Sequence, residues 1–475
     1  MADFDVIVVG GGGAGIAAAI EALDAGARVL LCEKADRIGG SAANSGGVIM
    51  AAGTDIQRER GVEDSVDDLY EHYMTHSKYL VEPQLARILC EGGQEVLDWL
   101  RSHGVTFDPA NLYVAGVENP KAPRGHPADG NGLGIMTALE GAAMSRGLEA
   151  VTRTRVQSLL QHDDGTVYGI VADNIEITAD AVVIASGGFG NNLELLERYY
   201  PEAARHGKDW HYYVGIRENV GDGLLMGVDA GAAIVGEGFG NANVHAQFSK
   251  EPEPYLPGWL VYINENGCRF MDETAPYVVA DTMVHQQSGG RCWAIMDHPA
   301  FTRDPKDPKY KSAEFLIFPK PNWEPEALQR HLQDGLVVMG QTIQELGEKL
   351  GIAAEAMAAT VEEYNRNSES GVDPHFRKVP SYLLPLENPP FYAIELRAAG
   401  VGTTHAGLRI DSETRVYNTQ GRPISGLFAA GECTGGVMSY YVMGGASMCN
   451  NFVFGRIAGR NAAAVAKARQ ALAVA

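Results

Sequence analysis

Residues 5–33 read DVIVVGGGGAGIAAAIEALDAGARVLLCE, and this stretch decides the fold. After Asp5, the four residues 6–9 are β-branched and apolar, which predicts a buried strand, and the segment up to Ala25 predicts a helix. Residues 28–32 then predict a second strand. A strand, a helix and a second strand in this order are typical of a doubly wound α/β sheet.

The turn between the first strand and the helix carries the pattern GxGxxG at Gly10, Gly12 and Gly15. The first glycine allows a tight turn, the second lets the backbone approach a pyrophosphate, and the third lets the helix pack on the strand. Glu33 ends the second strand, where a carboxylate can accept hydrogen bonds from both ribose hydroxyls. The sequence therefore predicts a dinucleotide site, which also includes the neighbouring residues Gly13, Ala14 and Lys34.

A second glycine cluster, DRIGGSAANSGG at 36–47, follows soon after Glu33. A nicotinamide dinucleotide does not need it, whereas the longer flavin dinucleotide needs more backbone donors along its pyrophosphate and ribitol. The cluster contains no histidine that could form a covalent link, so we expect non-covalent FAD. The residues assigned to this part of the site are Gly39, Gly40, Ser41, Ser45, Gly46 and Gly47.

Composition limits the other possibilities. At 475 residues the chain exceeds one ordinary core, so we expect two lobes. The net charge of −22 argues against nucleic acid or an anionic membrane surface as a partner. The six cysteines have no metal-ligand spacing, and there is no export signal or apolar run of about 18 residues. We therefore expect a cytoplasmic protein without a membrane span or a metal site.

The middle of the chain changes in character. Between 236 and 388, prolines cluster, Trp259 and Trp323 appear, and an amphipathic helical stretch covers 343–365. Strand patterning returns from 391 onward. The predicted fold class is therefore α/β, with a Rossmann-like FAD-binding domain at 1–235 and 389–475 that is interrupted by an inserted α+β capping domain at 236–388.

Two further glycine-rich turns belong to the predicted flavin domain. The apolar strand 181–185 ends in Ser-Gly-Gly, which places Ala185 and Gly187 beside a bound dinucleotide. Near the other end, the turn 444–447 opens a long helical pattern. Such a turn directs free N–H groups and the positive end of a helix dipole at one point, which favours an electron-rich ligand edge.

Taken together, several motifs resemble the fumarate reductase and ketosteroid dehydrogenase flavoprotein superfamily, in order and over nearly the whole chain. They are the N-terminal stretch 6–34, IGGSAANSGG, AVVIASGGFG, the turn GDG, GLFAAGE and GGASM. The resemblance implies an FAD lobe and a smaller cap that closes over the flavin ring, with the substrate between them. It also implies that Val156 meets the adenine, that Glu432 binds the ribitol, and that Ser447 and Met448 donate to the flavin pyrimidine.

The same resemblance bears on the substrate. Fumarate reductases are similar to this chain in the segment NENGCRFMDETAPY, but they have an arginine proton donor where Tyr277 stands, and a second arginine that clamps a carboxylate where Val442 stands. Burying a dicarboxylate without such cations is severely unfavourable. We therefore expect a substrate that is uncharged at its reacting end.

Ketosteroid dehydrogenases, which this arrangement resembles, have a tyrosine matching Tyr277 in the cap and another matching Tyr441, four residues before a glycine matching Gly445. The resemblance implies that a phenol O–H and a backbone N–H polarise a ketone, and that a tyrosinate-like base removes the adjacent proton while a hydride leaves to the flavin. Which tyrosine is the base stays open. A serine expected two residues after Tyr441 is Met443 here, so we consider the hydroxyls of Ser439 and Tyr440 as replacements.

The function expected from the sequence is an FAD-dependent 3-ketosteroid dehydrogenase that introduces a C=C bond next to a ketone, with the 4,5-bond favoured over the 1,2-bond. Its expected partners are a small apolar ketone, a steroid, and an external electron acceptor, which would place it in steroid metabolism and lipid degradation. An ene-reductase acting on an enoate and a flavin-binding protein whose tyrosines only pack remain as alternatives. His126 and His405 are weaker site candidates, for which a structural role is at least as good an explanation.

Overall fold

The computed structural model describes residues 2–112, 114, 122–248, 256–310, 321–440 and 443–474. The chain forms two compact units. Unit 1 consists of Met1–Glu202, Gly215–Asn241 and Thr403–Ala475, and unit 2 consists of Ala203–Val214 and Ala242–Gly402. Within the described residues, every helix is too short or too polar to cross a lipid bilayer.

Unit 1 is built on an eight-stranded sheet with the order β17-β18-β8-β1-β2-β5, to which β7 and β6 are joined beside β8. Strand β1 pairs in parallel with β2 on one side and with β8 on the other. Its apolar residues are buried, as expected for a parallel strand that is covered on both faces. The strands of this sheet are β1 (Phe4–Val9), β2 (Val29–Cys32), β5 (Glu149–Val151), β6 (Val156–Gln161), β7 (Val167–Ala172), β8 (Ile175–Ile184), β17 (Arg415–Tyr417) and β18 (Pro423–Ala429).

Two small two-stranded sheets complete the strands of unit 1, namely β3 (Val48–Met50) with β4 (Gly125–Pro127), and β10 (Ile234–Val235) with β16 (Gly407–Leu408). The helices of this unit are α1 (Gly13–Asp24), α2 (Gly40–Ala43), α3 (Asp55–Glu59), α4 (Val66–His76), α5 (Pro83–Ser102), α6 (Asn131–Ser145), α7 (Leu193–Tyr199), α9 (Asp222–Asp229) and α15 (Ala446–Val474).

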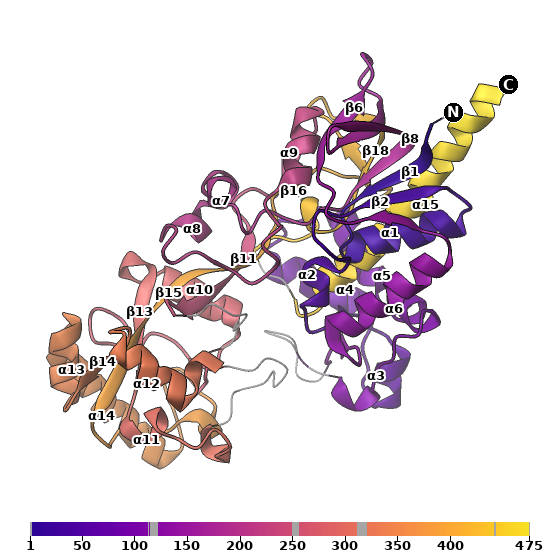
Figure 1. The fold of residues 1–475 in the computed structure, drawn as a ribbon. Coiled ribbons are helices and arrows are strands. Elements are labelled where there is room, and N and C mark those ends of the chain that lie inside the picture. Colours follow the sequence, from indigo (N-terminus) through magenta and orange to yellow (C-terminus); the bar gives the residue numbers. More distant parts are fainter. Residues whose placement is uncertain are drawn as a thin grey trace. The chain divides into compact units, whose positions relative to one another are not determined.

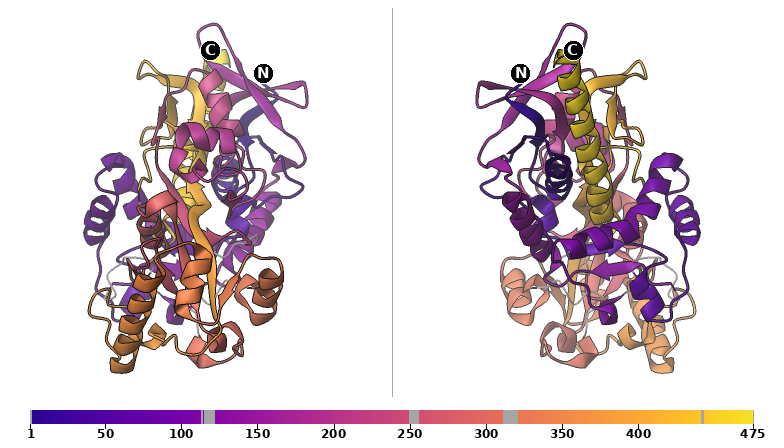
Figure 2. Two further views of the ribbon diagram at one scale, coloured as in Figure 1. Left: turned by 90° about the vertical axis from the view of Figure 1, so that its left-hand side faces the viewer. Right: turned by 90° about the vertical axis from the view of Figure 1, so that its right-hand side faces the viewer.

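The first and last helices, α1 and α15, lie side by side on the sheet (Figures 1 and 2). Their close approach requires glycine, because a Cβ atom on Gly455 or Gly459 of α15 would overlap the backbone of Ala14 or Ala18 of α1. The two ends of the sequence are thereby joined in one core, and the first lobe predicted from sequence is discontinuous in the chain, as expected.

Unit 2 is built on a six-stranded sheet in which β15 pairs with β11, β13, β14 and β9, and β13 also pairs with β12. Alternate residues of its strands enter two different cores, one containing Tyr262 and Ile394 and the other Ile263 and Ala393. Both faces of this sheet are therefore buried. Its strands are β9 (Tyr212–Tyr213), β11 (Gly240–Ala246), β12 (Val261–Ile263), β13 (Arg291–Met296), β14 (Val338–Gly340) and β15 (Phe391–Thr404).

Different helices supply the two cores of unit 2. One core takes residues from α10 (Tyr277–His285), α11 (His298–Phe301) and α12 (Pro325–Gln333). The other takes residues from α13 (Ile343–Leu350) and α14 (Ala354–Ser370), which pack together beside β14 (Figure 1). These two helices replace the single amphipathic stretch predicted at 343–365, because the chain turns at Gly351 with a left-handed φ of 70°.

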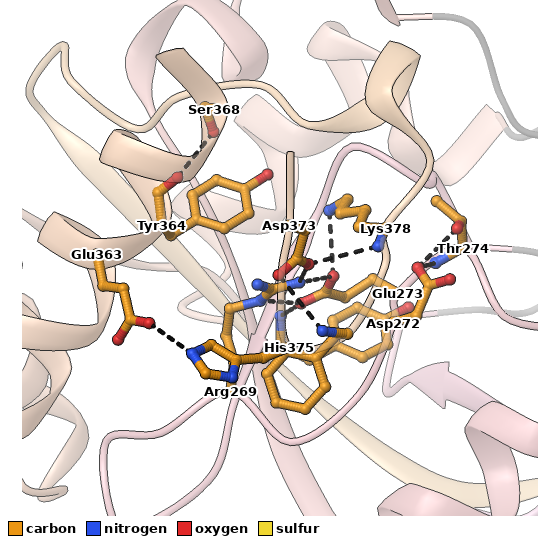
Figure 3. Close-up of polar contacts among 12 residues, drawn as sticks. Arg269, Asp272, Glu273, Thr274, Glu363, Tyr364, Ser368, Asp373, His375 and Lys378 are labelled. Carbon is orange, nitrogen blue, oxygen red and sulfur yellow. Dashed lines mark hydrogen bonds and ion pairs between the residues drawn. The ribbon is translucent and has the colours of Figure 1, made fainter. Parts of the chain in front are cut away.

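A buried group of charged residues fixes the segment that leads to α10 (Figure 3). Arg269 donates to both carboxylate oxygens of Glu273 at 2.9 and 2.8 Å, and also to Asp373 at 3.0 Å. Lys378, which is fully buried, lies 3.2 Å from Glu273 and donates to the carbonyl of Leu260 at 2.6 Å. The two cations lower the pKa of Glu273 against the opposing effect of burial. Two positive and two negative charges therefore balance inside unit 2.

The boundaries of the two units differ from those predicted from sequence. The inserted unit begins at Ala242 and ends at Gly402, and it also includes Ala203–Val214. Most of the strand that we assigned to the returning flavin domain, β15, pairs within the sheet of unit 2. The sequence of a strand has the same pattern of apolar residues in either sheet, because this pattern does not show which strands are its neighbours. The helix α8 (Pro201–Ala204) also crosses a boundary.

Candidate functional site

Unit 1 contains a cavity of about 770 Å³, including the open space at its mouth, at the carboxyl ends of β1 and β2. Parallel sheets commonly bind ligands at this end of their strands. Twelve residues assigned to a dinucleotide from sequence line the cavity together: Gly10, Gly12, Gly13, Ala14, Glu33, Lys34, Gly40, Ser41, Val156, Ala185, Gly187 and Glu432.

The three glycines of the GxGxxG turn have three different environments. Gly10 has a φ of 104°, and Gly15 packs so closely on the Gly10 carbonyl that a Cβ atom would overlap it. A Cβ atom on Gly12 would instead have no protein atom within 4 Å. Protein atoms thus surround Gly10 in the turn and Gly15 at the packing position, whereas Gly12 between them faces open space. A pyrophosphate close to this backbone fits the turn.

Glu33 lies at the end of β2 with both carboxylate oxygens fixed. One accepts from the N–H of Gly11 at 2.7 Å and the other from the N–H of Ala35 at 2.6 Å. These bonds hold an acceptor group on the wall of the cavity at the position expected for a ribose contact.

Lys34 has a structural partner that the sequence did not indicate. Its ammonium lies 2.6 Å from Asp222 at the start of α9, and Arg155 pairs with the other oxygen of Asp222 at 2.7 Å. All three residues line the cavity. Asp222 thus carries one negative charge against two positive ones, and this part of the cavity wall keeps a net positive charge.

Two polar groups of the cavity are suited to a hydroxylated ligand. The hydroxyl of Ser186 is buried and has no hydrogen-bond partner within the described residues. Glu432 accepts from the N–H of Thr404 at 2.9 Å and from its hydroxyl at 3.1 Å. Burial raises the pKa of Glu432 to about 7 despite these bonds. Ribitol hydroxyls that donate to Glu432 and accept from Ser186 would satisfy both groups.

Seven assigned residues lie outside the cavity lining. Gly15 packs against Gly10, and Gly39 donates its N–H to the carbonyl of Gly11 at 2.9 Å. Ser45 donates to the carbonyl of Ala42 at 2.8 Å and accepts from the N–H of Gly47 at 3.2 Å. These glycine-cluster residues shape the loop around the cavity. Gly46, between them, is partly buried, and Ser447 and Met448 belong to the last helix.

The last helix begins where the sequence predicted. Ser447 and Met448 lie in the first turn of α15, where N–H groups lack carbonyl partners from the helix itself. Gly445 precedes this turn with a φ of 86°, and a Cβ atom there would meet the backbone of Met50. The close approach to β3 therefore requires a glycine. Asn450, in the same part of the helix, has both amide atoms buried without a hydrogen-bond partner in the described chain.

Sequence reasoning missed part of the cavity. The residues that line the cavity without having been assigned to the dinucleotide include Ile216, Glu218, Asn219, Asp222 and Asn451. The turn GDG at 221–223 was recognised as one of the motifs of the superfamily, but its residues were not assigned to the dinucleotide. Asn451 lies just beyond the two helix residues that were assigned. Cys32 also lines the cavity, where burial raises its thiol pKa to about 12 and leaves it unreactive.

The assigned tyrosines belong to different units. Tyr277 is the first residue of α10 in unit 2. Tyr440 belongs to unit 1 and is 39% exposed, with the ammonium of Lys78 3.3 Å from its ring centre. Tyr441 lies outside the described residues, as does Val442. Their assignment to catalysis remains a proposal.

Ser439, considered as a proton relay, has a different hydrogen-bonding role. Its side chain is buried, its hydroxyl donates to the carbonyl of Ser77 at 3.0 Å, and its own carbonyl accepts from His405 Nδ1 at 2.6 Å. The hydroxyl is therefore committed to holding two segments together.

Both histidine candidates are buried and have partners at both ring nitrogens. His405 donates from Nδ1 to Ser439 and accepts at Nε2 from the hydroxyl of Thr403 at 3.0 Å. His126 donates from Nδ1 to the carbonyl of Arg124 at 2.9 Å and accepts at Nε2 from Thr54 at 3.0 Å. Burial lowers the pKa of each to about 4. Both are neutral structural histidines, so the structural explanation holds for them.

A sheet with parallel central strands, the GxGxxG turn, a carboxylate at the end of the second strand and further glycine turns around one cavity is typical of a flavin dinucleotide-binding oxidoreductase. Comparison with known proteins agrees. The chain belongs to the FAD binding domain family, whose model matches residues 5–448. It is an FAD-dependent oxidoreductase, and both the cofactor and the fold class predicted from sequence are confirmed.

Several proteins are similar over nearly the whole chain. A probable fumarate reductase of Shewanella frigidimarina is 31% identical over 96% of this chain and 74% of its own length. A vinyl phenol reductase of Lactiplantibacillus plantarum is 27% identical over 97% of this chain and 96% of its own length. Among solved structures, a 3-ketosteroid-delta4-(5alpha)-dehydrogenase of Rhodococcus jostii with bound 4-androstene-3,17-dione is 28% identical over 97% of this chain and 96% of that one, with a TM-score of 0.76.

Proposed function

We propose that the protein is a dehydrogenase of apolar cyclic ketones that introduces a C=C bond next to the carbonyl, with a 3-keto-steroid as substrate and the 4,5-bond as the favoured position. The observation that carries this proposal is that the chain has Tyr277 and Val442 at positions where the resemblance to fumarate reductases implies arginines. A neutral ketone needs hydrogen-bond donors without a fixed charge, and phenols provide them.

The similarity to the steroid-bound dehydrogenase supports the choice of substrate. The alignment covers almost all of both chains. The probable fumarate reductase, in contrast, extends well beyond the part that matches. The vinyl phenol reductase is matched along its length as well, and its name describes a substrate without a carboxylate. Neutral substrates therefore occur among the similar proteins of matching length.

In the proposed reaction, bound FAD supplies the hydride acceptor. A phenol O–H and the N–H of Gly445 polarise the ketone oxygen, which makes the adjacent C–H acidic. The second tyrosine, as its tyrosinate, takes that proton while the β-hydrogen leaves as hydride. Tyr277 and Tyr441 supply the two phenols. The buried charges at Arg269 and Glu273 fix the segment from which Tyr277 starts its helix, so the phenol begins from a rigid position.

A second candidate runs the same chemistry in the reductive direction on an activated alkene. It is favoured by the identity of 31% with a probable fumarate reductase. Anaerobic mixing separates the two functions. A dehydrogenase bleaches its oxidised flavin with a saturated 3-keto-steroid, whereas an enoate reductase has its reduced flavin reoxidised by the enoate and ignores the steroid.

The phenols can be tested by removing each hydroxyl. We expect Tyr277→Phe and Tyr441→Phe each to lower steroid turnover by roughly 100-fold or more while FAD stays bound. Tyr168→Phe, on β7, is the matched control and should retain activity. Steady-state turnover and flavin absorbance measure the two effects. Full activity in both active-site variants would rule out this mechanism.

A further inference from the structure

The turn after α4 has an unusual backbone. We call residues 77–82 the strap. Within it, Lys78 and Tyr79 have φ angles of 53° and 57°, a left-handed conformation that is uncommon for side chains of this size. Such a conformation is unfavourable for a residue that has a side chain. Two in succession persist only where the surroundings hold them, and strain of this kind is concentrated at functional sites.

The strap is held against residues 436–440 of the same unit. The N–H of Glu82 donates to the carbonyl of Gly436 at 2.7 Å, and Ser439 donates to the carbonyl of Ser77 at 3.0 Å. Just before the strap, the phenol of Tyr73 donates to the carbonyl of Val437 at 2.8 Å. The strained turn is thereby fixed to the segment that leads into the glycine turn before α15.

The result is a built surface with apolar and cationic parts. Tyr79 is 67% exposed, Leu80 is 49% exposed, and Tyr440 presents its ring beneath the Lys78 ammonium. Lys78 has no carboxylate partner among the described residues. An ammonium above an aromatic ring turns only part of its surface to the ring, so its other N–H donors are available to a ligand.

We infer that Lys78 binds a carboxylate of the substrate, while Tyr79, Leu80 and Tyr440 contact the apolar frame to which it is attached. This inference rests on the proposed function and deepens it, because it assigns the substrate a negative charge away from the neutral ketone. The long stem of lysine suits such a task, since its methylenes cover apolar surface while its ammonium stays in water. The chain carries a net charge of −22, so an anionic substrate needs a local cation.

The carboxylate has two possible sources. It can be the tail of a saturated 3-keto-steroid, or it can be conjugated to the alkene in the reductive alternative. A single exposed ammonium provides one charge and no bidentate geometry, in contrast to an arginine clamp. The tail is the source that agrees with the absence of an arginine at Tyr277 and Val442.

The test compares acids with their methyl esters on the FAD-bound enzyme. The first pair is a saturated 3-keto-steroid with a short alkyl carboxylate and its methyl ester, and the second is an aryl enoate and its ester. We expect the wild-type kcat/KM for the steroid acid to exceed that for its ester about tenfold, mainly through KM, and the preference to weaken with added salt. Lys78→Met should remove this preference, and Lys78→Arg should retain most of it.

Lys467→Met, on the exposed part of α15, is the matched control and should behave as the wild type. Dissociation constants from flavin absorbance changes report the acid-to-ester ratio even without turnover. An unchanged ratio in Lys78→Met would overturn the inference, because a purely structural lysine affects acid and ester alike. If the enzyme turns over neither the steroid acid nor its ester, the proposed function is wrong, whatever the effect of Lys78. If the preference for the acid depends on Lys78 only in the enoate pair, the carboxylate is the one conjugated to the alkene.

Discussion

At the scale of single residues, Glu432 shows how the flavin cavity is prepared for a ligand. Its carboxyl accepts two hydrogen bonds from Thr404, but burial is the larger effect and raises its pKa to about 7. The folded-state pKa therefore lies above the ordinary value of 4.5. For such a group, the stabilising contribution is present below the ordinary pKa and is lost as the pH rises through the folded pKa. Ligand hydroxyls that donate to the carboxylate counteract this loss.

We therefore expect the FAD-free protein to lose on the order of 1–3 kcal/mol of unfolding free energy as the pH rises from about 5 to about 8. Glu432→Gln should lose much less, because glutamine does not titrate, and bound FAD should reduce the pH dependence of the wild type. Urea unfolding at a series of pH values measures all three. Superimposable pH profiles for wild type and variant would contradict this expectation.

At the scale of elements, the turn from β1 to α1 contains one glycine that is needed for folding and another that is needed for binding. Gly15 touches the Gly10 carbonyl, while Gly12 faces open space. We expect Gly12→Ala to fold normally and to weaken FAD binding by at least about tenfold, because its methyl group occupies the place of the pyrophosphate. Gly15→Ala should instead lose about 1–3 kcal/mol of stability, the range for an overpacked core. Circular dichroism and FAD titration distinguish the two variants; equal effects on folding would show that Gly12 is a packing position.

The elements of the flavin domain were predictable because their signals are local. A buried strand, a glycine turn and a helix follow one another within 5–33, and the carboxylate of Glu33 falls at the end of the next strand. The strap was not predictable. Lys78 and Tyr79 are ordinary turn residues in sequence, and their conformation depends on bonds to 436–440, more than 350 residues away. The partner of Lys34 was hidden for the same reason, since Asp222 is 188 positions further along the chain.

At the scale of the whole molecule, the sequence predicted an inserted unit but not its limits. The change in composition near 236 marks the insertion, while the structure begins it at Ala242 and ends it at Gly402. The early segment Ala203–Val214 joins unit 2 because Tyr212 and Tyr213 pair with β15. Such pairings between distant segments leave no mark on local periodicity. Both units nevertheless have a core of their own.

Separate cores predict separate responses to ligand and mutation. Among the described residues, those that line the cavity for FAD all belong to unit 1, so FAD at about 100 times its dissociation constant should stabilise that unit by roughly 2.7 kcal/mol. Arg269→Met should destabilise unit 2 by about 3–5 kcal/mol, because it leaves Glu273 and Asp373 with one buried cation fewer. Arg366→Met, which breaks an exposed pair on α14, should change little. Calorimetry should resolve two transitions, one moved by FAD and the other by Arg269→Met; a single transition moved by both would mean that the units unfold together.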